Sequence, residues 1–424
     1  MTHAMPHAKP TSSPPSTSKA ELLGVALACY GAGLGLVTAI LLFGASVWDG
    51  LRRLAGCGRG LRSAPAQVVP PSPAGSFRLW HGPLAAPVLF LIAALASAPG
   101  SAAPEASWGA VALVGVMVAI FAYQQAHRIG LEGTRRVVSL LAFGAMLLGA
   151  MSLDGFLRRG VAETPFLGKN GVGTLLATAL PLVQLSTVGL LDPVVAWGGM
   201  LVIVAALFLS MSQGGWVGAA AGQAVLLLFA APRLRRTAAL LVVMALVTAV
   251  ALGAYVLSTG GTARYLLLTR LDPFSSSKTE RILIWEASWR MFLDHPWRGV
   301  GIGAFGAAYP AYRLERASEK EMSFAHNIVL NLLAEMGLAG FAAFVWLVGT
   351  WVRQALGALR QGLRPERRDT LAALLAALTA MLVHQLFDGT FWSLHVGVGF
   401  WLLGALLLET ARHTAEEGDP AGGG

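Results

Sequence analysis

The strongest candidate for acid–base chemistry is His326, in the stretch Ser323-Phe-Ala-His-Asn327 ahead of a long apolar block. Asn327, Asn331 and Glu335 follow at intervals of four, so they share one face of a helix. Histidine is the usual general base at neutral pH, and ionisable groups in a membrane helix are costly and functional by default. The column of two amides and a carboxylate predicts either a substrate site or a link between helices.

Two arginines suited to holding phosphate, Arg281 and Arg290, precede this histidine. Arginine presents paired donors and keeps its charge at all physiological pH values. The segment around them predicts an amphipathic helix over 278–294 that lies on the outer membrane surface or caps the bundle. The evidence is a capping box, an apolar repeat at helical spacing and a terminating proline: Ser277-Lys-Thr-Glu280, then Ile282, Trp285, Trp289 and Phe292, then Asp294-His-Pro296.

Further polar residues stand where apolar blocks begin or end, and the alternation of the blocks places them on the same side as His326. They are Lys169, Asn170, Ser210, Ser212, Gln213, His384, Gln385 and Asp388. Segments distant in sequence therefore converge on one face of the membrane. His384 and Asp388 have an i,i+4 spacing that could hold a metal, but no third ligand is evident, so no metal is expected.

The elements that position these residues are membrane helices. The chain has 424 residues, of which 55% are hydrophobic and only 12% are charged, about half the charged share of a soluble domain. Because a spanning helix needs ~20 mostly apolar residues, the apolar blocks predict an all-α bundle of about eleven or twelve transmembrane helices. The candidate spans are 21–47, 83–98, 104–125, 137–153, 166–186, 193–211, 214–231, 237–257, 326–352, 370–388 and 390–409.

Composition divides the chain into five parts. The Pro-, Ser- and Thr-rich segment 1–20 is predicted to be a disordered tail. An N-terminal bundle of about eight helices covers 21–257, and a long loop covers 258–325. About three helices over 326–409 and a tail over 410–424 complete the chain.

The basic residues orient the bundle. Outside the long loop, most Lys and Arg fall in short segments on one side, which the positive-inside rule makes cytoplasmic. The long loop and the polar residues then face outward, the tail 410–424 faces inward, and the bilayer is the main partner. The net charge of +9 is explained by these cytoplasmic loops, so nucleic-acid binding is not expected. The two cysteines, Cys29 and Cys57, predict neither a disulfide framework nor a zinc site.

The segment 214–231 carries Gly214, Gly218 and Gly222 at four-residue spacing. Small residues so spaced let another helix approach closely. We therefore predict a tight helix–helix contact along this face rather than a chemical role.

Four motifs resemble the O-antigen ligase and polymerase family of bacterial polysaccharide assembly. The matching residues are Arg281-Ile-Leu-Ile-Trp285, Asp294-His-Pro-Trp-Arg-Gly-Val-Gly-Ile-Gly-Ala-Phe305, His326-Asn-Ile-Val-Leu330 and Glu335-Met-Gly-Leu338. Family members share an Arg-x-x-x-Trp helix, a Pro-x-x-Gly-x-Gly turn, a His-Asn pair opening the next helix and Glu-x-Gly after it. The similarity is close from Ser210 onward, whereas the N-terminal half agrees in hydropathy and in Lys169-Asn170.

The resemblance implies a membrane-embedded glycosyltransferase in the bacterial inner membrane. Such enzymes move a glycan from undecaprenyl diphosphate to an acceptor hydroxyl, on lipid A core, on a growing glycan or on a protein serine, at the periplasmic face. They use neither a metal nor another cofactor. Carried over, His326 is the base and Arg281 holds the diphosphate. The residues expected to bind substrate around them are Lys169, Gln213, Arg290, Asn327, Glu335 and Asp388.

One position departs from the ligase pattern. Ligases have an arginine after a Ser-rich helix end, where this chain reads Ser210-Met-Ser-Gln213. Glutamine donates a hydrogen bond but no charge, so we expect Lys169, Arg290 or Arg264 to supply the missing charge. The departure leaves a polysaccharide polymerase as the alternative within the class. A transporter, which would place polar groups near the bilayer midplane, and a non-catalytic scaffold are the alternatives outside it.

Overall fold

The computed structural model describes residues 83–160, 162–259, 276–389, 391 and 393–412. The predicted tail 1–20, the first candidate span 21–47, Arg264 and most of the predicted tail 410–424 lie outside these residues. All described residues belong to one compact unit that begins at Pro70.

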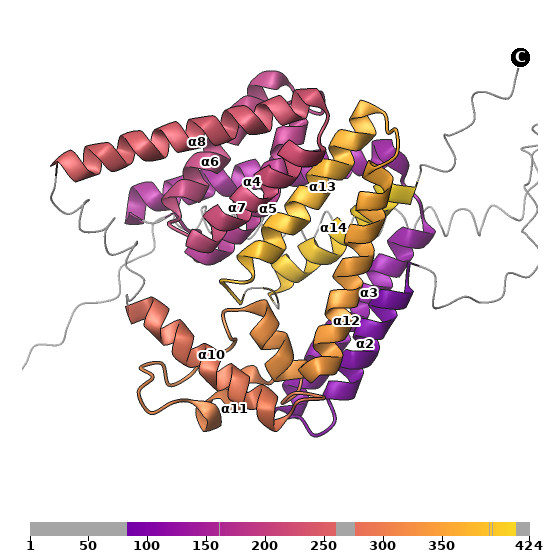
Figure 1. The fold of residues 1–424 in the computed structure, drawn as a ribbon, viewed down its shortest axis with the longest axis vertical. Coiled ribbons are helices and arrows are strands. Elements are labelled where there is room, and N and C mark those ends of the chain that lie inside the picture. The colour runs from indigo at the N-terminus through magenta and orange to yellow at the C-terminus, as the bar shows by residue number, and fades with distance from the viewer. Residues whose placement is uncertain (1–82, 161, 260–275, 390, 392, 413–424) are drawn as a thin grey trace, which may run out of the picture. The chain divides into compact units, whose positions relative to one another are not determined.

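The described part of the chain forms twelve helices (Figure 1), which confirms the predicted all-α class. Ten of them coincide with the ten candidate spans that fall in this part, and α10 and α11 lie between α8 and α12. The helices are α2 (Ala85–Ser97), α3 (Pro104–Ala126), α4 (Gly130–Arg159), α5 (Lys169–Ser186), α6 (Pro193–Leu209), α7 (Gln213–Phe229), α8 (Pro232–Thr259), α10 (Ser276–Asp294), α11 (Phe305–Tyr312), α12 (Ile328–Leu359), α13 (Pro365–His384) and α14 (Leu394–Arg412).

The outer surface of the helices is that of a membrane protein. Among the described residues, α3, α4, α12 and α14 are long and apolar enough to cross a membrane, and α2 and α6 are apolar but shorter. Large apolar side chains such as Leu246 and Val250 of α8 are mostly exposed. Contiguous exposed apolar surface of this kind is covered by lipid rather than water. The chain is therefore a multi-pass membrane helix bundle.

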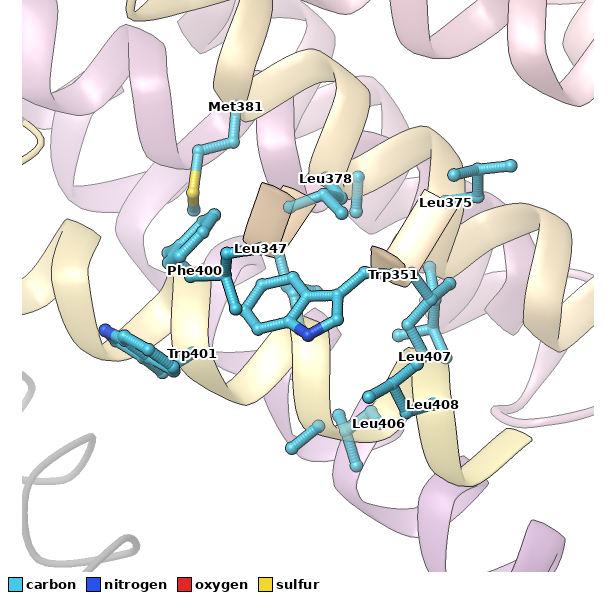
Figure 2. Close-up of a cluster of buried hydrophobic side chains, with 14 of the residues drawn as sticks. Leu347, Trp351, Leu375, Leu378, Met381, Phe400, Trp401, Leu406, Leu407 and Leu408 are labelled. Carbon is cyan, nitrogen blue, oxygen red and sulfur yellow. The ribbon is translucent and has the colours of Figure 1, made fainter. Parts of the chain in front are cut away.

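An aromatic core joins the C-terminal helices to the N-terminal ones. Trp351 of α12 is fully buried, stacks on Phe121 of α3 at 5.6 Å between ring centroids, and lies 4.9 Å from Phe400 of α14. Figure 2 shows the indole surrounded by leucines of α13 and α14. A Cβ at Gly404 would lie 2.3 Å from the indole ring, so glycine leaves the space that the tryptophan fills.

The glycines at four-residue spacing in α7 pack against α13, which confirms the predicted helix contact. A Cβ on Gly218 would lie 2.6 Å from the carbonyl oxygen of Ala380, and one on Gly222 would lie 3.1 Å from that of Ala376. The two backbones approach so closely because glycine has no side chain. The contact brings the first residues of α7 beside the last residues of α13.

Helix α12 is broken at Gly337, whose backbone angles (φ 61°, ψ −162°) are not helical. At its start the Ile328 amide donates to the Gln385 carbonyl, and at its end the Leu359 carbonyl accepts from Arg368. Along α13 the rise from Arg368 to Gln385 is ~26 Å, whereas a straight helix from Ile328 to Leu359 would rise ~46 Å. The segment 328–336 must therefore fold back toward the end of α13.

The turn after α10 satisfies the backbone groups that this break sets free. Val300 N donates to Ala334 O at 2.8 Å, Gly301 N to Glu335 O at 3.0 Å, and Leu338 N to Pro296 O at 2.8 Å. A Cβ on Gly337 would lie 2.5 Å from the backbone of Trp297. The Pro-x-x-Gly-x-Gly and Glu-x-Gly motifs are thus the two halves of one joint.

Candidate functional site

His326 and Asp388 form the centre of the site. His326 lies just before α12, and its Nδ1 is 3.2 Å from Oδ1 of Asp388, which follows the end of α13. The imidazole is 20% exposed and the carboxylate 4% exposed. The same carboxylate oxygen accepts from the amide of Gly389 at 2.8 Å. A carboxylate accepts hydrogen bonds, so Nδ1 carries a proton and Nε2 is left to accept one.

Asn327, the next residue in the chain, holds His326 in place. Asn327 is the N-cap of α12, and its Oδ1 accepts from the amides of Val329 and Leu330 at 2.9 and 3.1 Å. Its Nδ2 donates to Leu386 O at 3.1 Å, which ties the cap to the segment that carries Asp388. His326 itself has a φ of 53°, a left-handed conformation that is strained for a residue other than glycine. Strain of this kind accumulates at functional sites.

A second histidine, His384, joins three helices behind this pair. Its Nδ1 lies 3.0 Å from Oγ1 of Thr174 in α5, and its Nε2 lies 3.4 Å from Oγ of Ser212. Thr174 donates to Asn170 O at 3.0 Å, so the threonine accepts from the histidine. His384 is only 1% exposed. It fixes the starts of α5 and α7 against the end of α13.

Lys169 and Gln213 are the first residues of α5 and α7. Both are half-buried, and the bonds of Thr174 and Ser212 to His384 place these two helix starts at the same end of the bundle. Met211, just before the cap Ser212, has a φ of 53°. Met211 and His326 are the two non-glycine residues with positive φ in the described part of the chain.

The two candidate arginines lie on different sides of α10. Arg281 is half-buried and close enough to His384 for its charge to act on the imidazole. Arg290 is exposed and bonds to Glu286 at 2.7 Å, and Glu286 also holds Arg316 at 2.9 Å. Nine residues along a helix correspond to a rotation of about 180°. Arg281 therefore lies on the side of α10 whose charge acts on His384, and Arg290 lies on the opposite side.

Glu335 lies apart from the histidines, inside the joint of α12. The side chain is 1% exposed, its Oε1 accepts from the amide of Phe305 at 3.1 Å, and its Oε2 accepts from Nδ2 of Asn331 at 3.0 Å. Asn331 in turn accepts from the amide of Ala325 at 2.9 Å. These contacts link the loop to the helix. The role of Glu335 in binding substrate remains a prediction.

Helix α10 packs against the loop core with a different face from the one that carries the apolar repeat seen in the sequence. Its buried side chains are Leu283, Ile284, Ala287 and Met291, which pack with α11 and the start of α12. Ile282 and Trp289 of the repeat are 56% and 45% exposed. Glu280 of the predicted capping box accepts from the amides of Ser318 and Glu319, and the side chain of Ser277, the other member of the box, lies outside the described part of the chain. The helix is thus apolar on two faces.

Two features of the site were missed in the sequence. Thr174 is one hydroxyl in an apolar helix, and nothing in its spacing indicates a histidine partner. Oδ2 of Asp388 is buried without a hydrogen-bond partner, although the other oxygen of the same carboxylate has two. A buried carboxylate oxygen without a partner is costly, and a catalytic role is one explanation for such a group. Among the described residues, no group of three His, Cys, Asp or Glu could hold a metal.

The fold and this site define a class: a multi-pass membrane helix bundle that carries a histidine–aspartate pair and a second, buried histidine at one end. Residues 198–345 match the family model described as O-antigen ligase, which confirms the resemblance of the motifs. The match indicates glycan transfer of the O-antigen ligase and polymerase type, in lipopolysaccharide biosynthesis. It includes Gln213, Arg281 and His326, and it ends before His384 and Asp388. A search of curated proteins finds no match to the chain.

Proposed function

We propose that the chain transfers a glycan from undecaprenyl diphosphate to an acceptor hydroxyl at the periplasmic face of the bacterial inner membrane. The observation that carries the proposal is the His326–Asp388 pair, in which a buried carboxylate orients a partly exposed imidazole. A base and a fixed cation are the two groups that this substitution needs. The family match over residues 198–345 supports the reaction type.

The base in this reaction is Nε2 of His326. Asp388 holds Nδ1–H, so the opposite nitrogen takes the proton of the acceptor hydroxyl as its oxygen attacks C1 of the sugar. The partial exposure of His326 lets an acceptor approach, whereas the burial of Asp388 keeps the carboxylate on the imidazole. Asp388 is a positioning residue, since it acts through the histidine.

The leaving group is the lipid diphosphate. The bond between C1 and the phosphate oxygen breaks, and the diphosphate keeps the electron pair and gains negative charge. Arg281 stabilises this charge, with Lys169 and Gln213 at the starts of α5 and α7 as its partners. Arg290 lies in an exposed ion group with Glu286 and Arg316, and its role in binding substrate stays a prediction. Lys169, at the start of α5, is our first choice for the cation that replaces the ligase arginine, and Arg264 lies outside the described residues.

The acceptor in a ligase is the lipid A core. A polymerase of the same family adds the glycan to a growing chain and is the second candidate, because Gln213 stands where ligases have an arginine. The two reactions share the donor, the base and the leaving group. They differ in the acceptor that reaches His326.

The test is deletion of the gene and complementation with wild type, His326→Ala or Arg281→Ala. We expect the deletion to lose mature surface polysaccharide and to accumulate the lipid-linked precursor, and neither variant to restore it. His295→Ala and Lys320→Ala are matched controls, because both residues are exposed, lie in the same loop and are not part of the site. Both controls should complement in full.

The pattern of surface polysaccharide on a gel distinguishes a ligase from a polymerase. Loss of the whole glycan from lipid A core indicates a ligase, and a core with one repeat unit indicates a polymerase. Full complementation by the two site variants would show that the assignment of the base and cation is wrong. An unchanged glycan after deletion would favour the transporter or the scaffold.

A further inference from the structure

The side of α10 that faces away from the bundle exposes a row of large apolar side chains. The row consists of Ile282, Trp289, Leu293 and Trp297, which are 56%, 45%, 58% and 69% exposed. The first three recur at intervals of seven and four, so they lie on one face of the helix, and Trp297 follows in the turn after it. The opposite face of α10 is buried in the loop core. We call this set the tryptophan row.

The tryptophan row continues the exposed stripe of a membrane-spanning helix. The backbone of Trp297 packs against Gly337, at the break of α12. The next residue, Leu338, is 44% exposed, and Val345 and Trp346 on the same face of α12 are 51% and 61% exposed. A stripe of this kind on a helix long and apolar enough to span the membrane contacts lipid. The row therefore starts where the lipid-facing stripe ends.

The charges around the row are arranged for a boundary between lipid and water. The ion group of Glu286, Arg290 and Arg316 lies along one flank of α10, and exposed Arg298 follows Trp297. Tryptophan is enriched at the level of the lipid headgroups, where its ring is buried and its N–H is hydrated. Arginine at this level pairs with lipid phosphate. Apolar surface beside such cations matches the headgroup region of a bilayer.

We propose that the tryptophan row is inserted in the lipid headgroup and upper acyl region, so that α10 lies in the membrane surface as an anchor. Arg281, on the flank of the helix that faces His384, is then held at the depth of the lipid phosphates. A lipid-linked diphosphate reaches this arginine without leaving the membrane. The anchoring itself rests on the membrane fold and on these exposures, and does not require glycan transfer.

Site-directed spin labelling of the full chain in vesicles of phosphatidylethanolamine and phosphatidylglycerol tests this proposal. Cys29 and Cys57 are first replaced by serine, and single cysteines are placed at Leu293 and Trp297. Trp346→Cys gives the lipid reference, and Lys320→Cys, in an exposed part of the loop, gives the water reference. Collision with oxygen reports lipid exposure, and collision with a water-soluble nickel chelate reports water exposure.

The expected result is an oxygen-to-nickel accessibility ratio at positions 293 and 297 that exceeds the ratio at position 320 several-fold and lies below the ratio at position 346, which is deeper in the membrane. A water-like ratio at both positions would overturn the proposal and favour a platform for sugar rings. Protection from both reagents would also overturn it and would indicate a protein partner. None of these readouts depends on enzymatic activity, so failure of the proposed function leaves the test intact.

Discussion

The two ends of α13 both bury polar side chains, but the partners of these side chains differ. At the first end Arg367, Asp369 and Glu409 are each at most 5% exposed. Each bonds to a main-chain group of another segment: Arg367 to Thr410 O at 2.9 Å, Asp369 to Ala231 N at 2.7 Å, and Glu409 to Gly130 N at 3.1 Å. These contacts fasten helix ends to one another, and nothing in them requires a ligand.

At the second end the bonds run between side chains. His326 pairs with Asp388, and His384 bonds to Thr174 and Ser212. One carboxylate oxygen of Asp388 has no partner, and the backbone of His326 is strained. The difference teaches that burial of charge alone does not mark a functional site. Backbone strain and hydrogen bonds between side chains distinguish the second end, because a protein built for stability alone would remove the strain.

The largest effect expected from this comparison is that of His326→Ala. Loss of a general base lowers the transfer rate by about 10²–10⁴-fold. The fold should remain, since the imidazole is partly exposed and packs edge-on against Phe324 only on one side. The measurement is turnover of a purified lipid-linked glycan by the reconstituted protein, with the His295→Ala variant beside it. If the His326→Ala variant kept the wild-type turnover, the second end of α13 would have no catalytic role to distinguish it from the first end.

Asp388→Asn is expected to act through the histidine and to have a smaller effect. A hydrogen bond to a charged group contributes about 1.5–3 kcal/mol, which corresponds to a loss of about 10–100-fold in kcat. The KM for the donor should change little, because Asp388 does not hold the diphosphate. Combining this change with His326→Ala should add almost nothing. Additive losses in the double variant would show that Asp388 has a role of its own.

For Asp369→Ala, at the first end of α13, we expect a loss of stability without a loss of activity. The amide of Ala231 loses its acceptor, at a cost of about 1–3 kcal/mol in the free energy of unfolding, with no change in activity per folded molecule. Asp369→Asn is the matched control, since its amide oxygen can still accept the bond. Thermal unfolding in detergent measures the first quantity, and turnover measures the second. A loss of turnover in the folded Asp369→Ala protein would contradict the comparison.

The contrast between the two ends explains how much of the fold and of the site could be predicted from the sequence. Apolar blocks predict the helices, because length and hydropathy decide whether a segment spans a membrane. They also place His326 and Asp388 at one end. The break at Gly337 and the buried face of α10 could not be predicted, because both depend on the turn that packs between two segments distant in sequence. Thr174 is one isolated hydroxyl, and its role appears only when α13 lies beside α5.

Glu335→Gln sharpens the comparison, because Glu335 is a predicted substrate-binding residue but, like the residues of the first end, it is buried and bonds to a main-chain amide of another segment. The amide oxygen can replace Oε1 toward Phe305, but the amide NH2 then faces the NH2 of Asn331, and one hydrogen bond is lost. We expect a cost of about 1 kcal/mol in the free energy of unfolding and an unchanged KM for the donor. A raised KM at unchanged stability would instead place Glu335 among the substrate-binding residues.

The smallest effect is expected at Met211, and it tests whether the strain at the second end is real. Its φ of 53° disfavours every residue except glycine, by about 1 kcal/mol. Met211→Gly should therefore be more stable than Met211→Ala by about that amount, because both variants lose the same partly exposed side chain. Thermal unfolding of the two variants isolates the backbone term from the loss of the side chain. If this strain also holds the adjacent cap and Gln213 in position, the glycine variant gains stability and loses turnover together. Equal stability of the two variants would show that the turn is unstrained, and the side-chain bonds of His326 and His384 would then be the feature that distinguishes the second end.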